Sequence, residues 1–196
     1  MNDKIISKAE KWRLQTLVNR IGTNEDIARE YFTLANYIVD NYPERMETIQ
    51  APLLHIMSHC LELALKSVIK DAIDVGVLKV KWDSIVHSHS LNILSTQALS
   101  LYRKMGKLCE EDDKIYFSKT FPTQLKNICE ILQTNTSSYR YSHKVDKQGN
   151  LEGKSLPFVE DKESPNIGIL TPLFNDCYCA LGYTSHIISM TFPKEM

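Results

Sequence analysis

The chain has 196 residues, of which 43% are hydrophobic and 24% are charged, the proportions of an ordinary globular protein. Its 23 Lys and Arg residues nearly balance its 24 Asp and Glu residues, so the formal net charge of -1 provides no overall field that would attract nucleic acid or an anionic membrane. A local basic patch is still compatible with this balance. With only 7 Gly and 7 Pro, the chain lacks the turns of an all-β sandwich, and helical structure is favoured.

The sequence has no apolar run of the roughly 18 residues that a membrane-spanning helix needs, and its amino-terminal segment lacks the apolar core of a signal peptide. The cysteines form an odd set without a Cys-x-x-Cys pair: Cys60, Cys109, Cys129, Cys177 and Cys179. This pattern is typical of reduced thiols that pack as small apolar groups. We therefore expect a cytoplasmic protein that does not associate with a membrane.

The amino-terminal part of the chain predicts two amphipathic helices. In the first, apolar residues recur at helical intervals between Lys4 and Ile21, and Gly22 can end it in a left-handed turn. Thr23 and Asp26 then form a capping-box-like pair, which predicts the start of the second helix. Pro43 is expected to end that helix.

The most hydrophobic helix is predicted from Pro52 to about Ile73, with the wide apolar face that is expected of a central helix in a bundle. One narrow polar stripe runs along it at intervals of three and four residues: His55, His59, Glu62, Lys66 and Lys70. These side chains should therefore lie along one edge of the helix.

Residues 76–82 read as a connector. Ser88 or Ser90 then caps a helix that Gly106 ends. Residues 110–132 predict a further helix, which Pro122 should divide in two.

In that divided helix we expect Thr120 to cap the second part. The pattern changes after Gln133, and Tyr139–Tyr141 has the alternation of a short strand. A turn signal follows, and residues 156–159 could form a returning strand, so residues 138–162 are predicted to form a hairpin-like excursion.

A final helix is predicted from about Pro172 to Met190, and no internal repeat or second domain is indicated. The sequence thus predicts an all-α fold, an up-and-down bundle of five or six helices with a small β-hairpin-like excursion near residues 138–162. Residues 1–196 are expected to form one helical domain.

The polar stripe of the central helix is the first candidate site. His55, His59 and Glu62 could present three ligands to one metal ion from a single helix face. Alternatively the stripe faces solvent or an interface, with Glu62 in the favoured orientation for an ion pair with Lys66, four residues later. No second helix carries the Glu-x-x-His pattern of a di-iron bundle, so we expect neither a metal nor a cofactor.

Two further motifs contain histidine. His89, at the start of a predicted helix, could fix the packing of two helices by a hydrogen bond or act as an acid or base. In the segment Tyr139–His143, Arg140 is suited to phosphate, tyrosines can stack on bases, and His143 can move protons. The alternative is a tyrosine-rich hairpin that packs on the bundle, with Arg140 paired to Glu62 or to an Asp.

These motifs resemble a known family. The segment Ala51–Lys66, in which Glu62 and Lys66 follow an apolar run, resembles a helix of HEPN-like domains (higher eukaryotes and prokaryotes nucleotide-binding). His89, with leucines after it, is similar to the next landmark of that family. The segment Tyr139–Tyr141 resembles its short element that contains arginine and tyrosine.

HEPN-like proteins are small helical bundles, often dimeric. Many are metal-independent ribonucleases in toxin–antitoxin, phage-defence and RNA-processing systems, and others bind RNA or nucleotides or serve as scaffolds. The resemblance implies a homodimer that binds RNA or nucleotide, with a partner protein from the same operon. It implies a catalytic group of Arg140, His143 and His89 and a substrate-binding group of Glu62, Lys66, Tyr139 and Tyr141.

Nuclease members of that family carry an arginine followed, after four to six residues, by a histidine. The nearest approach in this chain is Arg140 and His143, with two residues between them. Ribonuclease activity and binding without cleavage therefore both stay open. The alternative from another class is a non-enzymatic interaction or scaffold bundle whose polar stripe lies in a subunit interface.

Overall fold

The computed structural model describes residues 23–105, 114–140, 143–145, 151–155 and 165–191. For residues 134–140 and for the two strands, the backbone alone is described. The helix expected between residues 4 and 21 lies outside the described residues.

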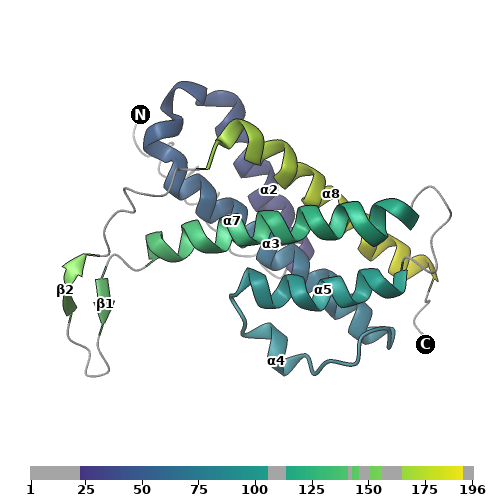
Figure 1. Cartoon of the computed structure of the whole chain (residues 1–196). Coiled ribbons are helices and arrows are strands. Elements are labelled where there is room, and N and C mark those ends of the chain that lie inside the picture. The colour runs from purple at the N-terminus through teal and green to yellow at the C-terminus, as the bar shows by residue number, and fades with distance from the viewer. Residues whose placement is uncertain (1–22, 106–113, 141–142, 146–150, 156–164, 192–196) are drawn as a thin grey trace, which may run out of the picture.

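The described residues form a helical bundle that contains six α-helices (Figure 1). The helical elements in chain order are α2 (Asn24–Asn41), η1 (Pro43–Arg45), α3 (Met46–Asp74), α4 (Asp83–Val86), α5 (Leu91–Met105), η2 (Tyr116–Thr120), α7 (Phe121–Arg140) and α8 (Ile167–Thr191). The two strands are β1 (His143–Val145) and β2 (Leu151–Ser155). The predicted all-α fold is confirmed. Within the described part of the chain, no helix has the length and apolar character needed to cross a membrane.

Helix α2 begins as its sequence predicts. The Asp26 N–H donates to Thr23 Oγ1 at 3.2 Å, and the Thr23 N–H donates to Asp26 Oδ2 at 3.0 Å. This reciprocal capping box satisfies two amide groups that a helix start leaves without partners. The helix ends at Asn41, two residues before Pro43, which opens the short helix η1.

Two helices begin earlier than their prolines suggest. Helix α3 begins at Met46 rather than at Pro52, and α8 begins at Ile167 rather than at Pro172. Both prolines are exposed on the outer face of their helices. Leu53 and Leu54, the two residues after Pro52, are fully buried, so the packing of the helix outweighs the hydrogen bond that the proline removes.

Helix α3 is the centre of the bundle and packs against α2, α5, α7 and α8 (Figure 1). Its apolar face includes side chains with no exposed surface: Leu53, Leu54, Met57, Leu61, Leu65 and Ile69. Burying each such side chain stabilises the fold by about 1.5–3 kcal/mol. The predicted role of this segment as the central helix is confirmed.

The predicted division near Pro122 takes a different form. No cap forms at Thr120, because the chain continues through the π-helical turn η2 directly into α7. Pro122 cannot donate a backbone hydrogen bond and its ring crowds the preceding turn, which a wider turn relieves. The wider turn also sets Phe117 and Phe121 against Tyr102, with ring centroids at 6.0 and 4.8 Å.

The hairpin-like excursion is present, and its described strands lie within residues 143–155. Strand β1 pairs antiparallel with β2, with His143 opposite Ser155 (Figure 1). Tyr139 and Arg140, expected in a strand, lie in the last turn of α7, since a formed helix gains one hydrogen bond for each residue it adds. The returning strand is β2, and residues 156–159 lie outside the described residues.

The cysteines behave as small apolar groups where the structure describes them. Cys60, Cys129 and Cys177 are free and buried, whereas Cys179 is exposed. Burial raises the pKa of the Cys129 thiol to about 12, so that it stays protonated. Cys109 lies outside the described residues.

Candidate functional site

Three of the predicted site residues meet at one carboxylate. Glu62, on the α3 face that turns toward α5, is only 2% exposed. Its Oε1 atom lies 3.0 Å from Lys66 Nζ and 3.0 Å from His89 Nδ1. His59 lies on the other side, with its Nδ1 atom 3.6 Å from Glu62 Oε2. We call these four residues the Glu62 cluster.

The sequence brings the cluster together in two ways. Glu62 and Lys66 are one helical turn apart on α3, so their contact is local. His89 comes from the loop before α5, 27 residues away, and only tertiary packing brings it to Glu62.

The start of α5 holds this loop in place. The Leu91 N–H donates to Gln133 Oε1 of α7 at 2.7 Å, which satisfies one free amide at the start of the helix. Ser90, one of the two predicted caps, accepts a long hydrogen bond of 3.4 Å from the Ile93 N–H. The loop that carries His89 is therefore attached to both α3 and α7.

Glu62 is ionised in spite of its burial. Burial by itself raises the pKa of this carboxyl, but the neighbouring His59, Lys66 and His89 side chains outweigh it and lower the pKa to about 2. A carboxylate with this pKa accepts hydrogen bonds and cannot donate them at neutral pH. The proton in the contact with His89 therefore belongs to Nδ1 of the imidazole.

The exposure of His89 matters for its chemistry. Its side chain is 64% exposed although Nδ1 contacts a buried carboxylate. A neutral imidazole that donates from Nδ1 carries its free lone pair on Nε2. A carboxylate that orients a histidine in this way is the arrangement by which proteins present an imidazole as a general base.

His59 and His55 do not extend the cluster into a metal site. His59 Nδ1 lies 3.6 Å from Glu62, a weaker contact than an ordinary hydrogen bond, and this buried nitrogen has no closer partner among the described residues. The ring packs edge-on against Tyr31, with centroids 4.9 Å apart. His55 is exposed, and across the described ranges no three His, Cys, Asp or Glu side chains are grouped to hold a metal ion.

The remaining predicted site residues are described less fully. Tyr139 and Arg140 lie at the end of α7 and His143 lies in β1, each by its backbone alone, and Tyr141 lies outside the described residues. The predicted contact between Arg140 and Glu62 therefore stays a prediction. Sequence reasoning missed the role of Gln133, because a polar residue at the end of an apolar stripe gives no sign of its partner.

Comparison with known proteins adds no relative: no family model matches the chain, and no curated protein or solved structure is significantly similar to it. The functional interpretation therefore depends on the chemistry of the Glu62 cluster.

Proposed function

We propose that the chain is a single HEPN-like domain of the cytoplasm that binds RNA or a nucleotide. The observation that carries the proposal is the Glu62 cluster. Glu62, Lys66 and His89, which stand at landmark positions of the resemblance, come from two parts of the chain and lie together. A buried ion pair contributes little net stability compared with apolar packing, so positioning the exposed His89 ring is the better explanation of its presence.

In its binding form, the site uses His89 as the contact with the ligand. The exposed ring can stack on a base or hydrogen-bond to a phosphate or ribose group through Nε2. Glu62 holds the ring orientation from below, and Lys66 keeps Glu62 charged and in place. Arg140 supplies the phosphate contact that the resemblance implies.

In its cleaving form, the site adds proton transfer at an RNA phosphodiester. His89 Nε2 takes the proton of a ribose 2′-hydroxyl, whose oxygen then forms a bond to the adjacent phosphorus. The 5′-oxygen leaves with a proton from His143, so the reaction needs no metal. Only two residues separate Arg140 from His143, fewer than the four to six of the nuclease members, so the cleaving form requires a different arrangement of these two side chains.

The alternative function is a scaffold or interaction module, and one observation favours it. Helix α2 exposes large apolar side chains at its surface, with Leu34 43% and Tyr37 53% exposed. Leu34 and Tyr37 lie one helical turn apart, and adjoining exposed apolar side chains favour a surface that binds another protein. The same face suits the proposed homodimer, or a partner protein from the same operon.

RNA binding by matched histidine variants separates the two functions. Fluorescence anisotropy of a labelled single-stranded RNA is measured with the unmodified chain, with His89→Ala and with His87→Ala. His87 is an exposed histidine two residues away, and within the described part of the chain it forms no ion pair with Glu62, so it is the control. We expect His89→Ala to weaken binding by about tenfold, or about 1.4 kcal/mol, and His87→Ala to leave it unchanged.

Gel analysis of the same labelled RNA shows whether cleavage occurs in the presence of EDTA. The ribonuclease form is supported if the unmodified chain cleaves the RNA and the His89→Ala variant does not. If the unmodified chain does not bind RNA or nucleotides even at low salt, the proposal is wrong and the scaffold function is favoured.

A further inference from the structure

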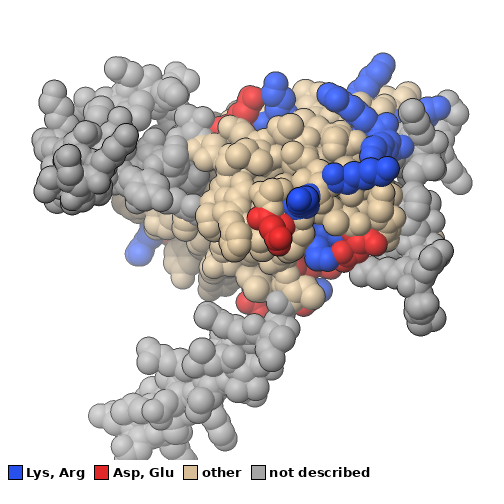
Figure 2. Space-filling model, turned by 90° about the horizontal axis from the view of Figure 1, so that it is seen from below, with Lys and Arg blue, Asp and Glu red and all other residues tan. Residues whose placement is uncertain are grey.

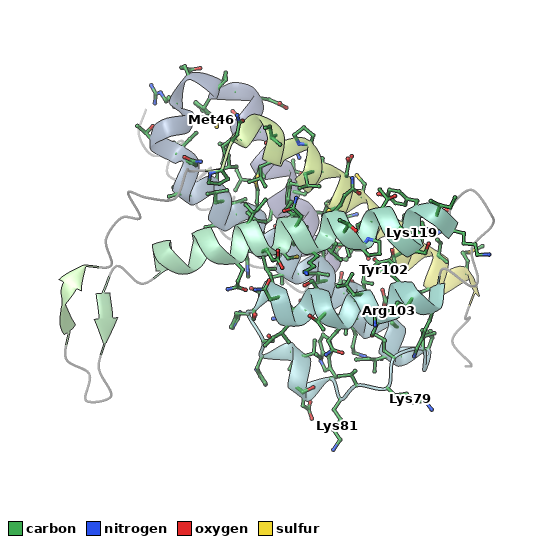
Figure 3. The ribbon with its side chains drawn as sticks, viewed as in Figure 1. Met46, Lys79, Lys81, Tyr102, Arg103 and Lys119 are labelled. Carbon is green, nitrogen blue, oxygen red and sulfur yellow. The ribbon has the colours of Figure 1, made fainter. Side chains whose placement is uncertain are left out.

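A second group of cations lies away from the Glu62 cluster. Its members are all exposed and come from the connector after α3, the end of α5 and the turn η2: Lys79, Lys81, Arg103, Lys104 and Lys119. Figure 3 labels four of them and shows Lys79 and Lys81 extending outward from the connector. Figure 2 shows Lys and Arg side chains gathered on one part of the face that carries this connector. We call these five residues the basic surface.

Two contacts between elements fix the parts of the chain that carry the basic surface. The Lys104 ammonium donates to the Val77 carbonyl at 2.6 Å, which holds the connector against the end of α5. Tyr102, fully buried, stacks on Phe117 and therefore holds α5 against η2. Arg103 and Lys119 lie next to these buried rings on adjoining elements, so packing beneath the surface sets their backbone positions.

The charges of the basic surface are not neutralised by described carboxylates. Within the described part of the chain, none of the five residues forms an ion pair, whereas Lys66 and Lys70 each pair with a carboxylate four residues away along α3. A cluster of exposed cations attracts a partner with closely spaced negative charges. Single-stranded nucleic acid has this property along its whole backbone.

The turn η2 adds hydroxyl groups to these charges. Ser118 and Thr120 are exposed on either side of Lys119. Hydroxyl groups and cations together are the usual ligands of backbone phosphates. Single π-helical turns occur frequently at functional sites, which agrees with a binding role for η2.

The basic surface and the Glu62 cluster lie at opposite ends of α5. His89 precedes the helix and Arg103 lies 12 residues after its first residue, Leu91. At 1.5 Å per residue, this distance along the axis is about 18 Å. One strand several nucleotides long could contact both regions, whereas a mononucleotide could not.

We propose that the basic surface binds the phosphate backbone of single-stranded RNA, without reading its bases, and so holds a strand whose other part reaches His89. This inference rests on the proposed function in taking RNA as the ligand. It adds a second contact surface and the requirement for a strand rather than a mononucleotide. The described residues of the surface are cations and hydroxyl groups, which contact phosphates and do not select bases.

The test measures how RNA affinity depends on salt. Three proteins are titrated with labelled 20-nucleotide poly(U) between 50 and 300 mM KCl. They are the full chain, the basic-surface variant Lys79→Gln/Arg103→Gln/Lys119→Gln and the control variant Arg29→Gln/Arg45→Gln/Lys126→Gln. Each variant removes three exposed charges. Each phosphate contact on a single strand contributes about 0.7 to the steepness of the plot of log K against log salt concentration. We therefore expect the basic-surface variant to make this slope less steep by about 2 and the control variant to leave it nearly unchanged.

The outcomes separate this inference from the proposed function. If RNA binding depends on His89 but both triple variants behave alike, the basic surface is not an RNA-binding surface and the proposed function stands. If the basic-surface variant loses binding while His89→Ala does not, the basic surface is supported and the Glu62 cluster is not the site. Binding to phosphatidylserine vesicles without binding to poly(U) would overturn the RNA proposal in favour of a membrane. Equal thermal unfolding curves exclude loss of folding as the cause.

Discussion

The chain uses its positive side chains in two contrasting ways. In the Glu62 cluster, the Lys66 side chain is 7% exposed and contacts a carboxylate at 3.0 Å. In the basic surface, Lys79, Lys81 and Lys119 are exposed and have no ion pair with any described carboxylate. This difference in burial and pairing indicates which positive side chains contribute to the stability of the fold. A buried cation must have a partner within the protein, whereas an exposed cation is solvated and stays available for a ligand.

The largest expected effect comes from breaking the buried pair. We expect Lys66→Ala to lower the free energy of unfolding by about 3–5 kcal/mol, because it leaves the Glu62 charge buried without its nearest cation. Urea denaturation followed by circular dichroism measures this loss. The double variant Glu62→Leu/Lys66→Met is the control and should recover most of the stability, since both charges are replaced by apolar groups. A loss below about 1 kcal/mol in the single variant would show that the pair is effectively solvated.

Acid should weaken the Glu62 cluster within a defined range of pH. Because the folded pKa of Glu62, about 2, lies below its ordinary value of 4.5, its stabilising contribution is complete above pH 4.5 and is lost as the pH falls toward 2. The shift corresponds to about 3 kcal/mol at most. Urea denaturation of the unmodified chain and of Glu62→Gln at pH 5 and pH 2.5 should show that their difference in stability shrinks at the lower pH. A difference that is constant over this range would contradict the lowered pKa.

A smaller loss of stability is expected from removing the buried hydrogen bond of Tyr102, which lies beneath the basic surface. Tyr102 donates its hydroxyl proton to Thr184 Oγ1 at 2.8 Å, and the Thr184 hydroxyl in turn donates to the Ala180 carbonyl. Tyr102→Phe removes one buried hydrogen bond and should lower the free energy of unfolding by about 1 kcal/mol. The salt dependence of RNA binding should not change, because the stack on Phe117 is retained. Thermal unfolding and the poly(U) titration together test this separation between the core and the surface.

The smallest effect is expected at the basic surface itself. Lys79→Gln should change the free energy of unfolding by less than about 0.5 kcal/mol, because an exposed lysine without an ion pair contributes little to folding. Urea denaturation of this variant beside Lys66→Ala compares the two uses of lysine directly. A loss as large as that of Lys66→Ala would remove the distinction between the two regions.

The sequence predicted the structural features that depend on neighbouring residues. Thr23 and Asp26 form their capping box because the two side chains are three residues apart at a helix start. Glu62 and Lys66 pair because they lie one turn apart on a helix whose apolar period is clear. The all-α fold follows from the same periodicity, repeated in one segment after another.

Tertiary structure decided the features that join distant segments. Helix α3 continues through Pro52 because the core buries the residues around it. Phe117 and Phe121 meet Tyr102 of α5 only because η2 and α7 pack against that helix. His89 reaches Glu62 only through the packing of α5 on α3 and α7, and the basic surface unites residues 79–119 only through the contact of α5 with η2. Residue spacing along the chain determines contacts within one helix, whereas contacts between helices depend on the burial of whole apolar faces. The sequence therefore predicted the local pair of Glu62 and Lys66, whereas the contact of His89 with Glu62 and the grouping of the basic surface depended on tertiary structure.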